Sequence, residues 1–278
     1  METLESLTQL TAMVRTSPKY RAIAPELVHL IGSQELAKRN NLKAAVKATK
    51  NKLHQITGAY WQGKPDYGEW LDLLQRASAE DNTPDQKLLH TTCRTLMAHH
   101  ASTRERLPIL REFYNVLFAG LPPIRSVLDL ACGLNPLTIP WMGLPAGAHY
   151  TACDINGEQM AFLGEALPLL GVTGKAVVCD LLQEVPQEPV DVALLLKTIP
   201  CLEQVDRAIG SRLLREINAS VLIVSFPAQS LGGRNKRMVD TYSSHFATLL
   251  SAVVGHWEVE QFSFPTEVVF RLHQLHVQ

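Results

Sequence analysis

The chain has 278 residues, of which 46% are hydrophobic and 19% charged, and a formal net charge of −1. This length suits one large domain or a catalytic domain with an extension. No uncharged apolar run approaches the roughly 18 residues that a membrane span requires. Met1 is followed by acidic Glu2 and Glu5 rather than by a basic and apolar leader. We therefore expect a globular cytoplasmic protein without a membrane segment or a secretory signal.

Neither the cysteines nor the histidines form a recognisable framework. The five cysteines lie far apart and include no CxxC pair, and the ten histidines show no HExxH-type spacing. Apolar surroundings favour reduced thiols that behave as small hydrophobic groups. The sequence therefore predicts no disulfide network and no bound metal.

The first 120 residues or so have helical periodicity. Asn41 can cap a helix whose apolar face is Leu42, Val46, Leu53 and Ile56. A second face carries the cations Lys43, Lys47 and Lys50. Between residues 11 and 58, nine basic residues stand against two acidic ones, a balance of +7. The cationic stripe is either a solvated helix face or a surface for a polyanion such as RNA.

From Pro122 onward, short β-branched runs alternate with helical ones. The predicted strands cover residues 126–132, 149–155, 175–181, 190–197, 220–226, 257–264 and 268–275. Helix-length segments separate the first five strands, which predicts an α/β fold with a parallel sheet covered by helices on both faces. Three residues separate the last two strands, which predicts an antiparallel hairpin at the sheet edge. This order is typical of a Rossmann-like methyltransferase sheet, whereas a dinucleotide dehydrogenase more often adds a sixth parallel strand.

Four consecutive predicted strands each end near a charged residue: Asp129, Asp154, Asp180 and Lys197. Ligands of parallel sheets bind outside the carboxyl ends of the strands, so we expect these side chains along one rim. Aspartate is also common in such turns as a helix cap, and one such residue alone would indicate little. The regular set of four favours a binding site.

The turn after the first strand, "DLACGLNPL" (129–137), contains a single glycine, Gly133. It departs from the GxGxxG pattern, which disfavours a pyrophosphate cradle. Asp154 is placed to accept hydrogen bonds from ribose hydroxyls, and Asp180 with Leu181 could bind adenine. Adenosine bound without phosphates indicates S-adenosylmethionine as the cofactor.

Four segments make a family resemblance specific: "HASTRERL" (100–107), "DLACGLNPL", "LLLKTIPCLE" (194–203) and "VSFPAQSLGGR" (224–234). Together with "LHQITGAY" (53–60) and "TEVVF" (266–270), they resemble the aminoglycoside-resistance 16S rRNA (guanine-N7)-methyltransferases. The run "PWMGLPA" (140–146) is closest to the sisomicin-gentamicin type of antibiotic producers. The resemblance covers most of the chain, and it implies methylation of one decoding-site guanosine in the 30S ribosomal subunit.

The resemblance also implies roles for individual residues. Arg106 would pair with the methionine carboxylate of S-adenosylmethionine. The other implied cofactor residues are Tyr60, His100, Ala101, Ser102, Ala131, Gly133, Asp154, Asp180, Leu181 and Leu196. Lys197 and Arg234 would act on the RNA side as the catalytic pair. Residues 1–105 would form a helical rRNA-binding and ribosome-binding domain, and residues 106–278 the methyltransferase domain.

The residues themselves agree with this chemistry. Guanine N7 carries a free lone pair, so catalysis is mostly positioning and needs no general base. Lys197 can donate to guanine O6 or hold a phosphate, although it could also be a surface lysine. Arg234, Lys236 and Arg237 follow two glycines in "SLGGRNKR", which suits phosphate contacts alongside those of Lys43, Lys47 and Lys50. We expect the target base to be flipped out of its helix.

Alternatives remain at this point. Pro200-Cys201 could be the nucleophile segment of a cytosine-C5 methyltransferase, although Cys201 falls where a helix is expected. Adenine N1 of the same rRNA helix is another possible target. The chain could also be a small-molecule methyltransferase or a ribosome-binding factor without catalytic activity.

Overall fold

The computed structural model describes residues 2–39, 41–57, 60–80, 86–228, 238–253 and 257–274. The helices before the sheet are α1 (Glu2–Arg15), α2 (Pro25–Ala37), α3 (Leu42–Ile56), α4 (Tyr67–Glu80), α5 (Lys87–Met97), α6 (Ala101–Arg106), the 3-10 helix η2 (Leu107–Ile109) and α7 (Leu110–Leu117). The strands are β1 (Ser126–Leu130), β2 (His149–Asp154), β3 (Thr173–Val178), β4 (Val190–Leu196), β5 (Ala219–Pro227), β6 (Trp257–Ser263) and β7 (Glu267–Gln274). Between them lie η3 (Asn135–Trp141), α8 (Gly157–Leu169), α9 (Ile199–Leu202), α10 (Ile209–Glu216) and α11 (Met238–Ser251).

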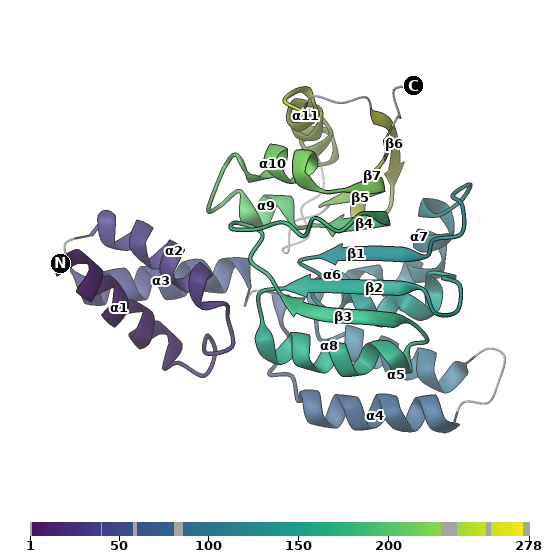
Figure 1. Ribbon diagram of the computed structural model, residues 1–278, viewed down its shortest axis with the longest axis horizontal. Helices are drawn as coiled ribbons and strands as arrows, with labels where there is room; N and C mark the ends of the chain where they lie inside the picture. Colours follow the sequence, from purple (N-terminus) through teal and green to yellow (C-terminus); the bar gives the residue numbers. More distant parts are fainter. Residues whose placement is uncertain are drawn as a thin grey trace.

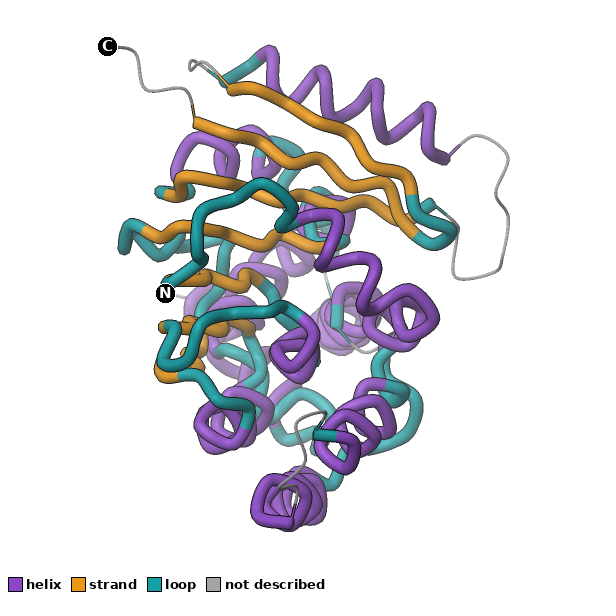
Figure 2. The backbone as a smooth tube through the Cα atoms, turned by 90° about the vertical axis from the view of Figure 1, so that its right-hand side faces the viewer, coloured by secondary structure: helices purple, strands orange, loops and turns teal. Residues whose placement is uncertain are grey.

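The seven strands form one sheet in the order β3-β2-β1-β4-β5-β7-β6. Strands β1 to β5 are parallel, and β7 pairs antiparallel with both β5 and β6. The predicted α/β fold and the terminal hairpin are confirmed, with β7 inserted beside β5 so that β6 forms the edge. The sheet is strongly twisted: in Figure 2 the strands near the top run across the view, whereas the lower ones are seen nearly end-on.

Strand β3 differs most from its prediction, because it ends at Val178 instead of continuing to Leu181. The Cys179 amide still donates to the carbonyl of Asp154 (2.9 Å). The Asp180 carboxylate then accepts from the Leu182 amide (3.0 Å), which starts a turn. A side chain that bonds its own backbone two residues on ends a strand.

Successive side chains of a strand point to opposite faces of the sheet, so the hydrophobic core is divided between the two faces. Val127 and Tyr150 lie in one hydrophobic cluster with α4, α5, α7 and α8. Leu128 and Leu130 lie in the other cluster, with α10 and α11. Each central strand is therefore buried on both faces, and the rim at the carboxyl ends is left for a site.

Helices α1 to α3 form a separate lobe, which Figure 1 shows projecting beyond the carboxyl ends of β1 to β3. The predicted cap of α3 is confirmed, since the Asn41 side chain accepts from the Ala44 amide (3.1 Å). Helices α4 and α5 lie elsewhere, beside α8, where Trp70 meets Phe162 edge-on (5.9 Å between ring centroids). The helical residues before 105 thus divide between the lobe and the cover of the sheet.

The sequence predicted no membrane segment, no disulfide network and no bound metal, and the described residues bear on each of these points. None of their helices combines the length and apolar character that crossing a bilayer demands. All five cysteines are free thiols. Within the same part of the chain, no cluster of histidine, cysteine and acidic side chains has the arrangement of a metal site.

Candidate functional site

A cavity of about 690 Å³ opens at the carboxyl ends of β1 to β4. The lobe, the aromatic segment after α3, α6 and the strand ends all contribute to its wall. Its lining includes every cofactor residue expected from the sequence except Ala101, namely Tyr60, His100, Ser102, Arg106, Ala131, Gly133, Asp154, Asp180, Leu181 and Leu196. Ala101 is buried at the start of α6, next to this wall.

The turn after β1 has the backbone of a binding loop. Ala131 (φ +50°) and Gly133 (φ +52°) both lie in the left-handed region. The Gly133 amide donates to the Asp154 carboxylate (2.9 Å), which ties the ends of β1 and β2 together. A Cβ atom at Gly133 would lie 2.9 Å from Cε1 of His100. Glycine is therefore required here both by conformation and by space.

The side chains of Asp154 and Asp180 follow β2 and β3. The Asp154 carboxylate also accepts from the Ile155 amide (2.7 Å). Burial raises the pKa of Asp154, and these backbone donors oppose that effect. One oxygen of Asp180 binds the Leu182 amide, whereas Oδ2 is buried and has no partner among the described residues. A buried acceptor without a donor matches an incoming ligand N–H group, such as an adenine amino group.

His100 and Tyr60 form an aromatic wall at the start of α6. Their rings stack with centroids 5.8 Å apart. Burial, assisted by nearby cations, lowers the pKa of His100 to about 4, so the imidazole is neutral at pH 7. Its Nδ1 atom is buried without a partner in the described residues. This face of the cavity therefore offers flat rings and a neutral polar atom.

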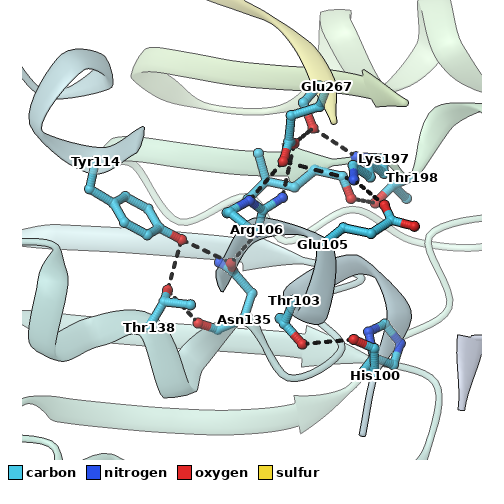
Figure 3. A network of polar contacts seen from close by, with 12 residues as sticks. His100, Thr103, Glu105, Arg106, Tyr114, Asn135, Thr138, Lys197, Thr198 and Glu267 are labelled. Carbon is cyan, nitrogen blue, oxygen red and sulfur yellow. Dashed lines mark hydrogen bonds and ion pairs between the residues drawn. The ribbon is translucent and has the colours of Figure 1, made fainter. Parts of the chain in front are cut away.

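Arg106 is fully buried in the network of Figure 3. Its Nε and Nη2 atoms donate to the two carboxylate oxygens of Glu267 (2.9 Å each), and Nη1 donates to Asn135 (2.9 Å). A guanidinium carries five N–H groups, so two remain for other acceptors. Sequence reasoning expected Arg106 to serve a ligand carboxylate, and it missed the protein carboxylate of Glu267, which holds Arg106 in place.

Lys197 directly follows the central strand β4 and has a left-handed backbone (φ +56°). Its side chain is only 8% exposed, so the surface-lysine alternative is wrong. Nζ donates to Glu105 (2.8 Å) and lies 3.9 Å from Glu267. The strand-end pattern located Lys197, but nothing in the sequence indicated these two acidic partners.

Asp129 is the most buried of the four charged residues expected at the rim. It is the second-last residue of β1 and is 1% exposed, and it lines the cavity together with Asp154, Asp180 and Lys197. Its Oδ2 accepts from Tyr150 (2.6 Å) and from Asn135 (3.0 Å). Burial raises the pKa of Asp129 to about 7 despite these donors. Asp129 therefore lines the cavity and, through its bond to Asn135, also holds the turn that follows β1.

Cys201 lies in α9, as expected, and lines the cavity. Its Sγ atom is 2.9 Å from the Tyr60 hydroxyl. Burial raises the pKa of the thiol, and the Tyr60 contact only partly opposes this. A nucleophilic cysteine requires the opposite shift. The geometry thus gives no support to the cytosine-C5 alternative.

The cationic stripe on α3 is present. Lys43 and Lys47 are exposed and Lys50 is half-buried. None of the three pairs with an acidic group in the described part of the chain. Arg234, Lys236 and Arg237 lie outside the described residues.

Comparison with known proteins identifies the family. Residues 16–271 match the family described as Ribosomal RNA methyltransferase (FmrO). The chain belongs to this family. A 16S rRNA (guanine(1405)-N(7))-methyltransferase of Micromonospora rosea is 37% identical over 271 residues, with 97% of each chain covered. A relative of the same name from Frankia casuarinae is 40% identical, with 96% of this chain and 93% of the relative covered.

Solved structures of ribosomal RNA methyltransferases share the fold. The 16S rRNA methyltransferase RmtF in complex with S-adenosyl-L-homocysteine superposes with a TM-score of 0.81 and is 31% identical, covering 98% of this chain and 99% of its own. For the 16S rRNA methylase RmtB the TM-score is 0.73 and the identity 27%, with 97% and 98% covered. The Rossmann-like methyltransferase fold and S-adenosylmethionine as cofactor are therefore confirmed, and the protein is an rRNA methyltransferase.

Proposed function

We propose that this enzyme methylates N7 of a decoding-site guanosine in 16S rRNA, acting in the cytoplasm on the assembled 30S subunit, and thereby confers aminoglycoside resistance. The observation that carries this proposal is the family match over residues 16–271, joined to a cavity that combines adenosine-type acceptors with a buried cation. Relatives that bear this activity in their names match nearly the whole chain.

The residues in the cavity suit S-adenosylmethionine, which supplies an electrophilic methyl group when bound. The free Oδ2 of Asp180 can accept from the adenine amino group, and Leu181 can cover the ring. Asp154 would accept from the ribose hydroxyls. Gly133 leaves room for the chain of the cofactor, and the two remaining N–H groups of Arg106 can reach a carboxylate.

For the methyl transfer, the protein mainly has to hold and align the base. Guanine N7 already has its lone pair, so no side chain needs to remove a proton before attack. Lys197 would donate to guanine O6, and its contact with Glu105 would orient the Nζ atom until the base arrives. A stacked and paired guanine cannot reach a cavity of this kind, so the base must be flipped out.

RNA contacts would come from two sides. Lys43, Lys47 and Lys50 lie on α3 of the lobe, which projects beyond the carboxyl ends of β1 to β3 and contributes residues to the cavity wall. Arg234, Lys236 and Arg237 follow β5, whose carboxyl end borders the same rim. Lysine and arginine at such positions bind phosphates, and this fixes the register of the RNA on the protein.

The test combines methyl transfer to purified 30S subunits with primer extension across the decoding-site helix. Lys197→Ala and Arg234→Ala should each abolish transfer and drug resistance and leave cofactor affinity nearly unchanged, because their cations serve the RNA. Asp154→Ala should weaken binding of S-adenosylhomocysteine in calorimetry. Lys175→Ala is the control, because Lys175 pairs with exposed Glu188 and should change neither quantity.

Three outcomes would contradict parts of the proposal. Equal loss of cofactor affinity in Asp154→Ala, Lys197→Ala and Arg234→Ala would refute the division between cofactor and RNA roles. A stop at an adenine of the helix would assign the enzyme to adenine N1. Binding of 30S subunits without any transfer of labelled methyl would instead identify a non-catalytic ribosome-binding factor.

A further inference from the structure

The lobe is joined to the cofactor site by a short strap, residues 21–24, between α1 and α2. The Ala24 amide donates to the carbonyl of Ile155 (2.9 Å), and the Gly157 amide donates to the carbonyl of Ala22 (2.8 Å). Ile23 and Asn156 form an antiparallel bridge. Arg21 adds an ion pair with Glu158 (3.0 Å). Residues 21–24 of the lobe thus run antiparallel to residues 155–158, which form the turn after β2 and the first two residues of α8.

This turn begins directly after Asp154, the last residue of β2. Ile155, whose carbonyl binds the strap, donates its own amide to the Asp154 carboxylate (2.7 Å). Ile23 and Ala24 are 3% and 2% exposed, so water does not replace these backbone contacts. The strap therefore holds both ends of the peptide segment that orients the ribose-binding carboxylate.

The lobe also forms part of the cavity wall. Pro18, Lys19, Ala22, Ile23 and Leu27 line the same cavity as Asp154 and Asp180. The lobe is at the same time the part of the chain that carries the lysine stripe of α3. If the lobe moves when it binds RNA, the backbone contacts of the strap would move the turn next to Asp154 as well.

We propose that the strap is a positioning element that couples rRNA binding by the lobe to cofactor binding at Asp154. This inference rests on the proposed function. When the lobe is fixed on the ribosomal subunit, the strap fixes the turn and so favours the cofactor-bound arrangement. Linkage requires the converse with the same factor, so the cofactor must tighten binding of the subunit equally.

The experiment measures the dissociation constant of S-adenosylhomocysteine for the full chain, free and with saturating 30S subunits. The product is used so that no turnover occurs. For the unmodified protein we expect binding at least about fivefold tighter with the subunit, the lower end of usual coupling factors. The affinity for 30S subunits should rise by the same factor when the product is present.

Ala24→Pro tests the backbone of the strap. Ala24 has φ −46° and ψ 123°, close to values that proline adopts, and its amide is the group that binds Ile155. Proline therefore fits the backbone angles but deletes this donor and places its ring against the Ile155 carbonyl, so the strap should loosen and the coupling factor should fall toward one. The double variant Arg21→Ala/Glu158→Ala removes an exposed pair, which does not endanger folding, and should lower the factor less.

Lys47→Ala is the matched control on the same lobe, because Lys47 is exposed and its side chain makes no hydrogen bond or ion pair with the strap among the described residues. It should weaken 30S binding equally with and without the product, which leaves the coupling factor unchanged. A factor of one in the unmodified protein, with 30S bound, overturns the inference and leaves the proposed function intact. An unchanged factor in both strap variants also overturns it. Absence of any 30S binding would refute the proposed function and the inference with it.

Discussion

At the scale of residues, the site depends on unusual backbone positions at strand ends. Gly133, Ala131 and Lys197 all have positive φ, and all line the cavity at the ends of β1 and β4. A left-handed conformation costs about 1–2 kcal/mol for a residue with a Cβ atom. Ala131 and Lys197 adopt this conformation despite its cost, and the chain therefore turns sharply at these two positions beside the site.

Gly133→Ala should lower both stability and affinity for S-adenosylhomocysteine. The new Cβ atom adds backbone strain and meets the His100 ring at 2.9 Å. Gly120→Ala is the control, because Gly120 also has positive φ (+77°) but a Cβ atom there would meet nothing within 4 Å among the described residues. Urea unfolding should show a larger loss of stability for Gly133→Ala than for Gly120→Ala. Calorimetry should show a loss of S-adenosylhomocysteine affinity for Gly133→Ala alone. Equal effects of the two substitutions would mean that the His100 contact is unimportant.

Asp129 should make stability depend on pH in an identifiable window. Its pKa is raised by burial to about 7, so the folded protein holds a proton that the unfolded chain releases near pH 4. The contribution of Asp129 to stability therefore falls between about pH 4 and pH 7 and is constant above that range. Asp129→Asn cannot ionise and keeps an acceptor for Tyr150. Relative to the unmodified protein, its unfolding free energy should rise across this window, and a constant difference would contradict the assignment.

At the scale of elements, α3 shows how one helix serves both packing and binding. Ala45, Val46, Thr49 and Leu53 are its buried residues, and the cations occupy other faces. The Asn41 cap satisfies the Ala44 amide, one of the free donors at the start of the helix. The helix therefore begins where the capping pattern places it.

Asn41→Ala should destabilise the protein by about 1 kcal/mol, because the donor at the start of α3 loses its acceptor. Chemical unfolding followed by circular dichroism measures this change. Asn51→Ala lies exposed in the same helix and serves as the control. It should be neutral or slightly stabilising, since alanine favours helix more than asparagine does. Destabilisation of the same size at Asn51 would refute a specific capping role.

At the scale of the whole molecule, the cavity joins the sheet to the lobe. The sheet supplies the acidic strand ends, and the lobe supplies part of the wall and separately carries the lysine stripe of α3. The overall charge of −1 conceals this separation. A protein with a nearly neutral total can therefore still bind a polyanion through one region.

The triple variant Lys43→Ala/Lys47→Ala/Lys50→Ala should bind 30S subunits more weakly and with less dependence on salt. Removing one lysine–phosphate interaction reduces the slope of log affinity against log salt by slightly less than one, so we expect a decrease of about two to three. Filter binding between low and physiological salt measures it. Cofactor affinity without RNA should stay the same, and an unaltered slope would exclude this face of α3 from the RNA interface.

Local sequence was enough to predict the strands, the cap of α3 and the rim position of Asp154, Asp180 and Lys197. These follow from local rules: side chains alternate along a strand, and the carboxyl ends of parallel strands meet at one edge. The assignment to the methyltransferase family also came from short contiguous segments, such as 129–137 and 194–203, which run from the end of a strand into the following turn and helix. The same rules placed Asp129 at the rim, where it lines the cavity, but they did not indicate its deep burial or its bonds to Tyr150 and Asn135.

The partners of the buried charges and the attachment of the lobe became known only from the packing of distant elements. Arg106 and Glu267 are 161 positions apart, and Lys197 and Glu105 are 92 apart. Arg21 and Glu158 are separated by 137. A buried charge needs a partner because water is excluded, but any nearby carboxylate satisfies that need. The three-dimensional arrangement decides which carboxylate becomes the partner, and the local periodicity of the sequence does not determine that arrangement.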